Sequence, residues 1–153
     1  MLGAIDHLAG ARCLVTSGRT AQGVAEAIAL GLTELSRLPC FSLEGGQLRH
    51  GPVEMLNADV GVIMFRDADP SARYVTSLAE FVVANSPSPL VIFDASGLPP
   101  VAGAHTVTCP TAAGLAGAFA MLPSAQRFMV DFAASRMPDA GTPLRCTKVT
   151  TVE

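Results

Sequence analysis

The chain has 153 residues, enough for one compact domain and too few for two of ordinary size. Half of the residues are apolar and 15% are charged, against roughly 25% charged in a typical domain. The net charge is −3 and no block of basic residues occurs, which argues against nucleic acid and anionic membranes as partners. The excess of apolar residues indicates that part of the surface lies against a partner chain.

The amino terminus has no basic segment, and Asp6 and His7 interrupt its apolar residues, so it does not resemble a secretory signal. No apolar stretch reaches the roughly 18 residues that a membrane span needs. The cysteines are widely spaced, form no Cys-x-x-Cys pair, and stand at Cys13, Cys40, Cys109 and Cys146. We therefore expect reduced thiols in a cytoplasmic protein that binds no metal.

Short apolar runs predict the strands. Residues 13–15, 60–65 and 90–93 are the strongest candidates, and residues 41–43 and 105–108 are weaker ones. Helical patterns separate the strong runs, and this alternation is typical of a parallel sheet with helices on both faces. The sequence therefore predicts a three-layer α/β sandwich with a five-stranded parallel sheet and a flavodoxin-like strand order.

The first long helix is predicted over residues 21–38, where apolar residues recur at helical spacing. Thr20 precedes this segment and is a suitable N-cap, because its hydroxyl can accept a bond from a free backbone N–H. Pro39 follows the segment and is expected to end the helix.

Two further helices are predicted over residues 70–84 and 111–136. Pro123 lies inside the second of them and predicts a kink. Residues 138–153 are rich in Thr, Pro and Val without helical spacing and predict an extended tail. We find neither repeat nor linker, so residues 1–153 are expected to form a single domain.

Glu34 is the first candidate catalytic residue. On a helical projection it falls at the border of the apolar stripe, beside Ala27 and Leu38. Partial burial there raises the pKa of a carboxyl group and suits a general base. From position alone, a solvated residue at the flank of the helix is the commoner explanation.

His50 is the second candidate. It precedes Gly51 and Pro52, which are well suited to begin a short helix over residues 52–56. The positive end of a helix favours the neutral imidazole, the form that shuttles a proton near pH 7. A histidine that only caps the turn is an equally good reading. The other two histidines are expected to be structural.

Lys148 is the only lysine in the chain, while the other nine basic residues are arginines. An amine can lose its proton and form a Schiff base, whereas a guanidinium cannot. The alternative is that a single solvated lysine arises by chance in a composition that prefers arginine.

These residues together carry a family resemblance. The segment Gly-Gln-Leu-Arg-His-Gly-Pro at residues 46–52, Glu34 sixteen positions before His50, and the terminal residues 148–153 resemble the second SIS (sugar isomerase) domain of the glucosamine-6-phosphate synthases. The resemblance extends to isomerases and deglycases without a glutaminase half, and it covers most of the chain. It implies a SIS fold and a phosphorylated ketose or amino sugar as substrate.

The resemblance also implies a role for each candidate. Glu34 matches the carboxylate that moves a proton between C1 and C2 of the open-chain sugar. His50 matches the histidine that assists ring opening and reaches into the active site of the neighbouring subunit. Lys148 matches the lysine that polarises the carbonyl or forms an imine with the ketose.

Two departures from the family pattern matter. Gly31 and Ala27 stand where family members usually carry a second lysine and a second glutamate on the first helix. The Ser/Thr-rich loop that grips phosphate belongs to the first SIS domain, which this chain lacks, and the turn at residues 66–70 is too acidic to replace it. The candidate substrate-binding residues are therefore those of the nearest comparable turn and of the His-Gly-Pro segment, namely Ser17, Gly18, Arg19 and Gly51.

Three functions follow from this reading. The first is the catalytic half of a sugar-phosphate isomerase, aminotransferring or deaminating isomerase, or deglycase, which needs no cofactor and pairs with another SIS domain in a homodimer or with a paired chain. The second is a non-catalytic module that senses a phosphosugar or mediates assembly. A flavodoxin-type nucleotide or flavin binder is weaker, because no Gly-x-Gly-x-x-Gly follows the first strand.

Overall fold

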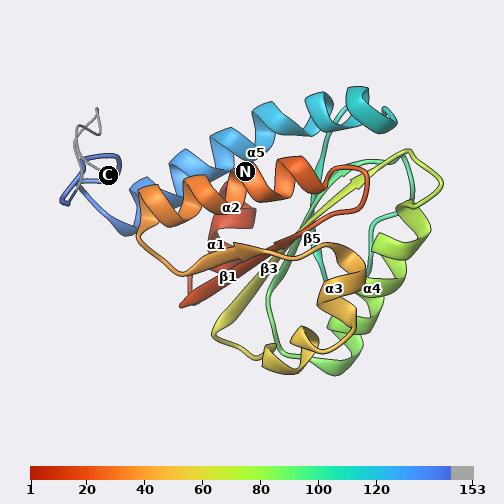
Figure 1. Ribbon diagram of the computed structural model, residues 1–153, viewed down its shortest axis with the longest axis horizontal. Coiled ribbons are helices and arrows are strands. Elements are labelled where there is room, and N and C mark those ends of the chain that lie inside the picture. Colours follow the sequence, from red (N-terminus) through yellow and green to blue (C-terminus); the bar gives the residue numbers. More distant parts are fainter. Residues whose placement is uncertain (146–153) are drawn as a thin grey trace, which may run out of the picture.

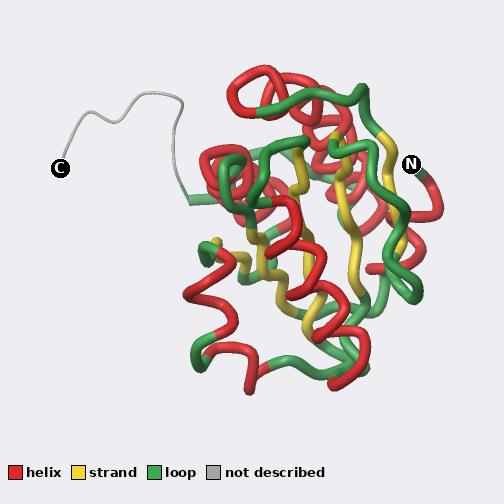
Figure 2. The backbone as a smooth tube through the Cα atoms, turned by 90° about the vertical axis from the view of Figure 1, so that its right-hand side faces the viewer, coloured by secondary structure: helices red, strands yellow, loops and turns green. Residues whose placement is uncertain are grey.

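A computed structural model describes residues 1–145, which form a five-stranded parallel sheet between two layers of helices (Figures 1 and 2). The strand order is β2-β1-β3-β4-β5, and every neighbouring pair is parallel. The predicted three-layer α/β sandwich with flavodoxin-like order is thus confirmed. In chain order the elements are α1 (Leu2–Leu8), β1 (Cys13–Ser17), α2 (Gln22–Ser36), β2 (Cys40–Ser42), α3 (Gly45–Arg49), the 3-10 helix η1 (Pro52–Met55), β3 (Val60–Asp67), α4 (Ala72–Asn85), β4 (Leu90–Ala95), β5 (His105–Thr108) and α5 (Gly114–Arg136).

All five predicted strands are present, including the two weaker ones. Every residue of β3 and β4 is buried. Helices cover both faces of these inner strands, which explains why their sequences are continuously apolar instead of alternating. The edge strands β2 and β5 are short and partly exposed, so their sequence signal is weaker.

A layer of helices covers each face of the sheet. Helices α1, α2 and α5 pack on one face of the sheet, and α3, η1 and α4 cover the other (Figure 1). Phe65, Phe93, Phe128 and Phe132 form a chain of ring contacts beneath α5, with neighbouring centroids 5.4–5.7 Å apart. All four rings belong to the larger core cluster.

The boundaries of α2 differ from the prediction. Thr20 does not cap the helix: its Oγ1 lies 3.1 Å from Ser71 Oγ, and Ala21 occupies the N-cap position without a side-chain bond. Its hydroxyl faces the loop before α4, so it is not available to the amides of α2. The helix ends at Ser36, two residues before the predicted Leu38, where Arg37 adopts a left-handed conformation with φ 54°.

Sequence reasoning missed α1 and α3, which have seven and five residues and are too short to show a helical period. Helix α5 continues through Pro123 as one element. After it, residues 138–141 form a turn, so the prediction of an extended chain is wrong there, and Arg37 holds this segment through Asp139 at 2.9 Å and the Thr142 carbonyl at 3.0 Å. The rest of the predicted tail, residues 146–153, lies outside the described residues.

Within residues 1–145, no helix is both long enough and apolar enough to cross a membrane. The same part of the chain contains no group of three or more His, Cys, Asp or Glu residues placed to hold a metal ion.

Helix α1 is attached to the sheet by two histidines. The Leu90 N–H donates to Nε2 of His7 at 3.3 Å, and the ring of His7 lies 6.1 Å from that of His105. Burial, and then the positive charges of His7 and the amino terminus, lower the pKa of His105 below its ordinary value. The folded state therefore favours neutral His105.

The lowered pKa of His105 makes the free energy of unfolding depend on pH. The contribution of His105 is complete above its unfolded pKa of about 6.5 and is lost as the pH falls towards its lower folded pKa. Tm is therefore expected to be a few degrees lower at pH 5.5 than at pH 7.5, and His105→Gln should reduce this difference. Circular dichroism melting measures it. His50→Gln is the control and should leave the difference unchanged; equal loss in both variants would contradict the assignment.

Candidate functional site

The turn after β1 is built by close approach of backbone to backbone. The Gly18 carbonyl accepts from the Gly45 N–H at 3.0 Å, and the Gly18 N–H donates to Gln22 Oε1 at 3.1 Å. A Cβ atom on Gly18 would lie 3.0 Å from the Ala21 carbonyl carbon. The close contact favours glycine here, and the turn joins the start of α2 to the start of α3 at the carboxyl end of the sheet.

Arg19 is turned towards α3. Its Nη1 lies 2.7 Å from Oε1 of Glu44, and its guanidinium carbon lies 5.4 Å from the centre of the Tyr74 ring. Arg73 contacts the same ring from 4.7 Å. The predicted substrate-binding residues Ser17, Gly18 and Arg19 thus share one turn, but the guanidinium is already paired.

Two buried polar atoms of this turn lack a partner. Within residues 1–145, Ser17 Oγ and Arg19 Nε form no hydrogen bond, and Thr106 Oγ1 on β5 is the third such atom. Ser17 is 2% exposed. Leaving a buried hydroxyl or N–H unpaired is costly, so this turn still has hydrogen-bonding capacity for a polar ligand.

The end of β3 and the turn after it are acidic, and their carboxylates already accept hydrogen bonds from the backbone. Asp67 Oδ2 accepts from the Gly114 N–H at 2.9 Å, and burial raises the pKa of Asp67. Asp69 accepts from the Ser71 N–H at 2.8 Å, and this hydrogen bond, the largest of several causes, lowers its pKa. Asp69 closes the turn and Asp67 holds the first residue of α5, so both carboxylates serve the fold, in line with the expectation that this turn does not suit phosphate.

A buried ion pair joins β3 and β4 near the carboxyl ends of the two strands. Arg66 is fully buried on β3 and donates to both carboxylate oxygens of Asp94, at 3.1 Å and 2.6 Å. It also donates to Thr76 Oγ1 and to the Pro99 carbonyl, each at 3.0 Å. Burial disfavours the ionised Asp94, but hydrogen bonds from Arg66 and Ser96 outweigh it and hold the pKa of Asp94 below its ordinary value. Because these bonds use the Arg66 guanidinium, we assign Arg66 a structural role.

Glu34 lies on the solvent side of α2, so the predicted partial burial is wrong. The neighbour used for that prediction, Ala27, is itself exposed. Glu34 shares an outer stripe with Glu26 and with Leu30, which is 62% exposed, because positions four and eight apart lie on one helix face. The Glu34 carboxylate is therefore accessible to any chain that packs against the outer face of α2.

Gly31 has a packing role. A Cβ atom there would collide with Sδ of Met129 on α5. The Met129 side chain occupies the space that a longer side chain at position 31 would need. The glycine therefore lets α2 and α5 pack closely.

His50 ends α3 and is exposed, with its N–H donating to the Gly46 carbonyl at 3.1 Å. Gly51 follows with φ 137°, a conformation that favours glycine, and Pro52 begins η1, so the predicted short helix is present and ends at Met55. The prediction did not include α3. In the structure His50 follows the last residue of α3 and also precedes η1.

Two of the candidate catalytic residues, Glu34 and His50, lie in different layers of the described chain. Glu34 belongs to the layer of α1, α2 and α5, and His50 to the layer of α3 and α4, on the opposite face of the sheet (Figure 1). Lys148 lies outside the described residues. Among the predicted site residues within 1–145, the structure brings Ser17, Gly18 and Arg19 together in one turn.

Sequence reasoning missed Glu44. Its Oε2 accepts from the Gly46 N–H at 2.7 Å, while Oε1 of Gln47 accepts from the Glu44 N–H at 3.1 Å, which forms a capping box. An acidic residue three positions before a glutamine was the available signal. Its pairing with Arg19, 25 positions earlier, has no local signal.

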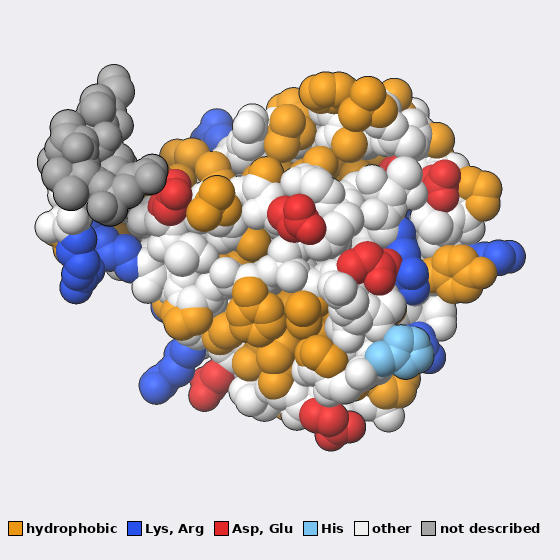
Figure 3. All heavy atoms as spheres, viewed as in Figure 1, with side chains coloured by type: hydrophobic (Ala, Val, Ile, Leu, Met, Phe, Trp, Pro, Cys, Tyr) orange, Lys and Arg blue, Asp and Glu red, His pale blue; other side chains and the backbone are white. Residues whose placement is uncertain are grey.

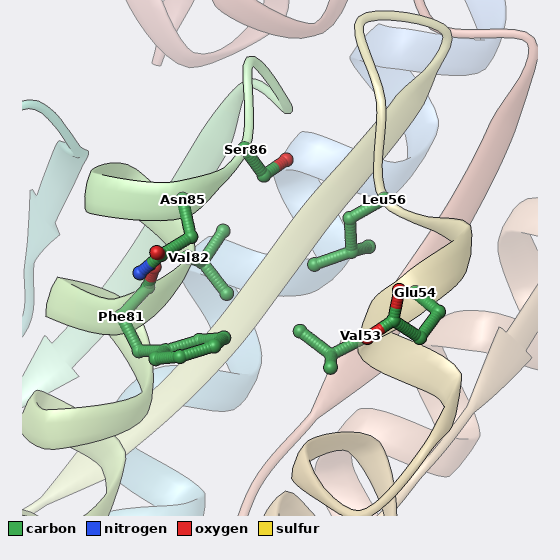
Figure 4. Close-up of a pocket in the computed structure, with 7 residues that line it drawn as sticks. All are labelled: Val53, Glu54, Leu56, Phe81, Val82, Asn85 and Ser86. Atoms are coloured by element: carbon green, nitrogen blue, oxygen red, sulfur yellow. The ribbon is translucent and has the colours of Figure 1, made fainter.

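A small pocket of about 150 Å³ lies elsewhere, between η1 and α4 (Figure 4). Val53 and Leu56 face Phe81 and Val82 across it, and Glu54 lies at its rim. Leu56 precedes β3 in the chain, so the pocket lies towards the amino ends of the strands, away from the Ser17 turn. It is separate from the candidate site.

The fold and the turn after β1 together define the class of protein. This is a doubly wound α/β domain whose candidate ligand turn lies at the carboxyl end of a parallel sheet, where ligands bind in such folds. The chain belongs to the SIS domain family, whose sequence profile matches residues 9–136. No curated protein matches its sequence.

Solved structures agree on the fold. The C-terminal domain of glucosamine-fructose-6-phosphate aminotransferase from Francisella tularensis is 15% identical, with a TM-score of 0.70 over 87% of this chain and 38% of that one. Tagatose-6-phosphate ketose/aldose isomerase from Escherichia coli is 21% identical, with a TM-score of 0.74 over 96% of this chain and 43% of that one. The chain thus spans less than half the length of these two structures.

Proposed function

We propose that this SIS domain binds a phosphorylated sugar and supplies the catalytic half of a sugar-phosphate isomerase, aminotransferring or deaminating isomerase, or deglycase. The observation that carries the proposal is the family match over residues 9–136. Two structural relatives bear the names of a ketose/aldose isomerase and a fructose-6-phosphate aminotransferase, which supports an open-chain sugar phosphate as the substrate class.

In this proposal Glu34 transfers the proton between C1 and C2, His50 assists ring opening, and Lys148 polarises the carbonyl or forms the imine. The turn of Ser17, Gly18 and Arg19 holds the anionic group. The unpaired Ser17 hydroxyl and the amino end of the 15-residue helix α2 support this part, because both favour an anion. Gly51 lets the chain turn beside His50.

The proposed site needs a second SIS domain, either another copy or a paired chain. Glu34 and His50 lie in opposite layers, so a partner has to bring a histidine to the exposed carboxylate. Hydrophobic side chains gather on the outer side of α5 (Figure 3), where Leu115 is 74% and Phe119 62% exposed. Covering them is favourable by about 25 cal/mol per Å² of apolar surface.

A non-catalytic sensing or assembly module is the second candidate. The observation that favours it is the contact between Gly31 and Met129, because Met129 occupies the space that the lysine implied by the family resemblance would need. Phosphosugar binding that is indifferent to Lys148→Ala would support this candidate over catalysis.

Calorimetry with fructose 6-phosphate tests the anion site. Ser17→Ala is expected to weaken binding about tenfold, since a hydrogen bond to a charged group contributes on the order of 1.5 kcal/mol. Thr106→Ala is the matched control, because it removes the unpaired buried hydroxyl of β5, outside the turn. Absence of binding, or equal weakening in both variants, would contradict the proposal. Solution mass with and without the sugar reports the pairing.

A further inference from the structure

One carboxylate joins the candidate anion turn to the helix that carries His50. Glu44 uses Oε1 for Arg19 Nη1 and Oε2 for the Gly46 N–H, both at 2.7 Å. The Arg19 and Glu44 side chains are each about one-third exposed, 33% and 32%. The Gly45 N–H adds a backbone bond to the Gly18 carbonyl at 3.0 Å. The start of α3 is therefore tied to the turn after β1.

His50 is one helical turn away from this attachment. Its N–H donates to the carbonyl of Gly46, the residue whose own N–H is held by Glu44. Helix α3 has only five residues, begins with Gly45 and Gly46, and is followed by Gly51. Glycines on both sides give the segment conformational freedom, so the position of His50 depends on the contact that holds the start of α3.

We propose that Glu44 is a positioning residue for His50, and that an anionic phosphoryl group at Arg19 competes with Glu44, loosens α3 and shifts His50. The inference rests on the proposed function, because it places the phosphoryl group of the ligand at the turn after β1. It adds a residue and a regulatory link that this function alone does not require.

The competition follows from charge. The Nε atom of Arg19 is buried and the side chain is one-third exposed, so an anion reaches the guanidinium beside Glu44. A phosphoryl group forms strong paired bonds with guanidinium, but next to Glu44 it meets a like charge. The two anions therefore disfavour each other at Arg19. Because such coupling is reciprocal, removing the charge of Glu44 strengthens phosphate binding, by about fivefold for a partly exposed pair.

The test follows the imidazole proton signals of the three histidines by NMR without ligand. Arg19→Gln and Glu44→Gln are expected to move the His50 signal to a similar position, and the double variant should move it no further. Arg19→Lys keeps the charge and should restore the wild-type signal. Asp59→Asn is the matched control, because Asp59 pairs with Arg12 at 4.0 Å on the exposed surface. His7 and His105, packed between α1 and β5, should not respond.

Inorganic phosphate then probes the link itself. It is expected to move the His50 signal of the wild-type chain, and Glu44→Gln should bind it about fivefold more tightly without further movement of His50. An unchanged His50 signal in both single variants overturns the positioning role. If phosphate shifts the Gly18 and Arg19 amides but not His50, the link is wrong and the anion site stands. If phosphate does not bind, the anion site fails, and the comparison without ligand still decides whether Glu44 positions His50.

Discussion

Replacing Glu34 by glutamine is expected to slow hydrogen exchange at C1 of fructose 6-phosphate by roughly 10²–10⁴-fold, the usual contribution of a general base. Glutamine has nearly the same shape but cannot accept the proton. Glu34 is exposed, so the substitution should change the free energy of unfolding by no more than about 0.5 kcal/mol. Loss of the C1 hydrogen signal in D₂O, followed by NMR at a protein concentration where the chain associates, measures the rate without requiring complete turnover.

Glu26→Gln is the matched control for this experiment. Glu26 is an exposed carboxylate of α2 on the same outer stripe as Glu34, eight residues earlier. Exchange should continue at the wild-type rate in this variant. Equal rates in Glu34→Gln and Glu26→Gln would remove Glu34 from the mechanism, and no exchange by the wild-type assembly would favour the sensing module.

Replacing Arg66 by methionine is expected to lower the free energy of unfolding by about 3–5 kcal/mol. Asp94 would remain buried with only the hydrogen bonds from Ser96, and a buried carboxylate that has lost its cationic partner is strongly unfavourable. Urea unfolding followed by circular dichroism measures the change. The double variant Arg66→Met, Asp94→Leu should recover much of the loss, because it removes both charges.

Arg12→Met is the control for this ion pair. Arg12 lies 4.0 Å from Asp59, with side chains 83% and 67% exposed, and exposed pairs contribute less than about 1 kcal/mol. If the Arg66 variant were no less stable than the Arg12 variant, the buried pair would not hold the carboxyl ends of β3 and β4 together.

The sequence was sufficient for the sheet, and the reason is physical. Residues 60–65 and 90–93 are continuously apolar because both faces of β3 and β4 are covered, so a local pattern carries the information. Residues 66 and 67 were assigned to a turn, yet β3 continues to Asp67. A charged residue can extend a buried strand only if a distant residue pairs with it, and Asp94 is 28 positions away from Arg66.

The site was less accessible to sequence reasoning. A helical projection placed Glu34 correctly beside Ala27, but which of the flanks is buried depends on where α5 packs, and α5 lies on the side of Gly31. The cluster of Ser17, Gly18 and Arg19 is local and could be predicted. The pairing of Arg19 with Glu44 could not, because it depends on the order in which β1 and β2 lie side by side.

The contact of Gly31 with Met129 also constrains how this domain can change. A lysine at position 31 collides with Met129 unless that side chain rearranges, and a smaller residue at position 129 alone leaves an empty space between the helices. A side chain at position 31 therefore has to be accommodated by a new conformation of Met129, whose sulfur and methyl end is the part that must move. A designed variant with a larger side chain at position 31 and a smaller residue at position 129 avoids the collision between α2 and α5.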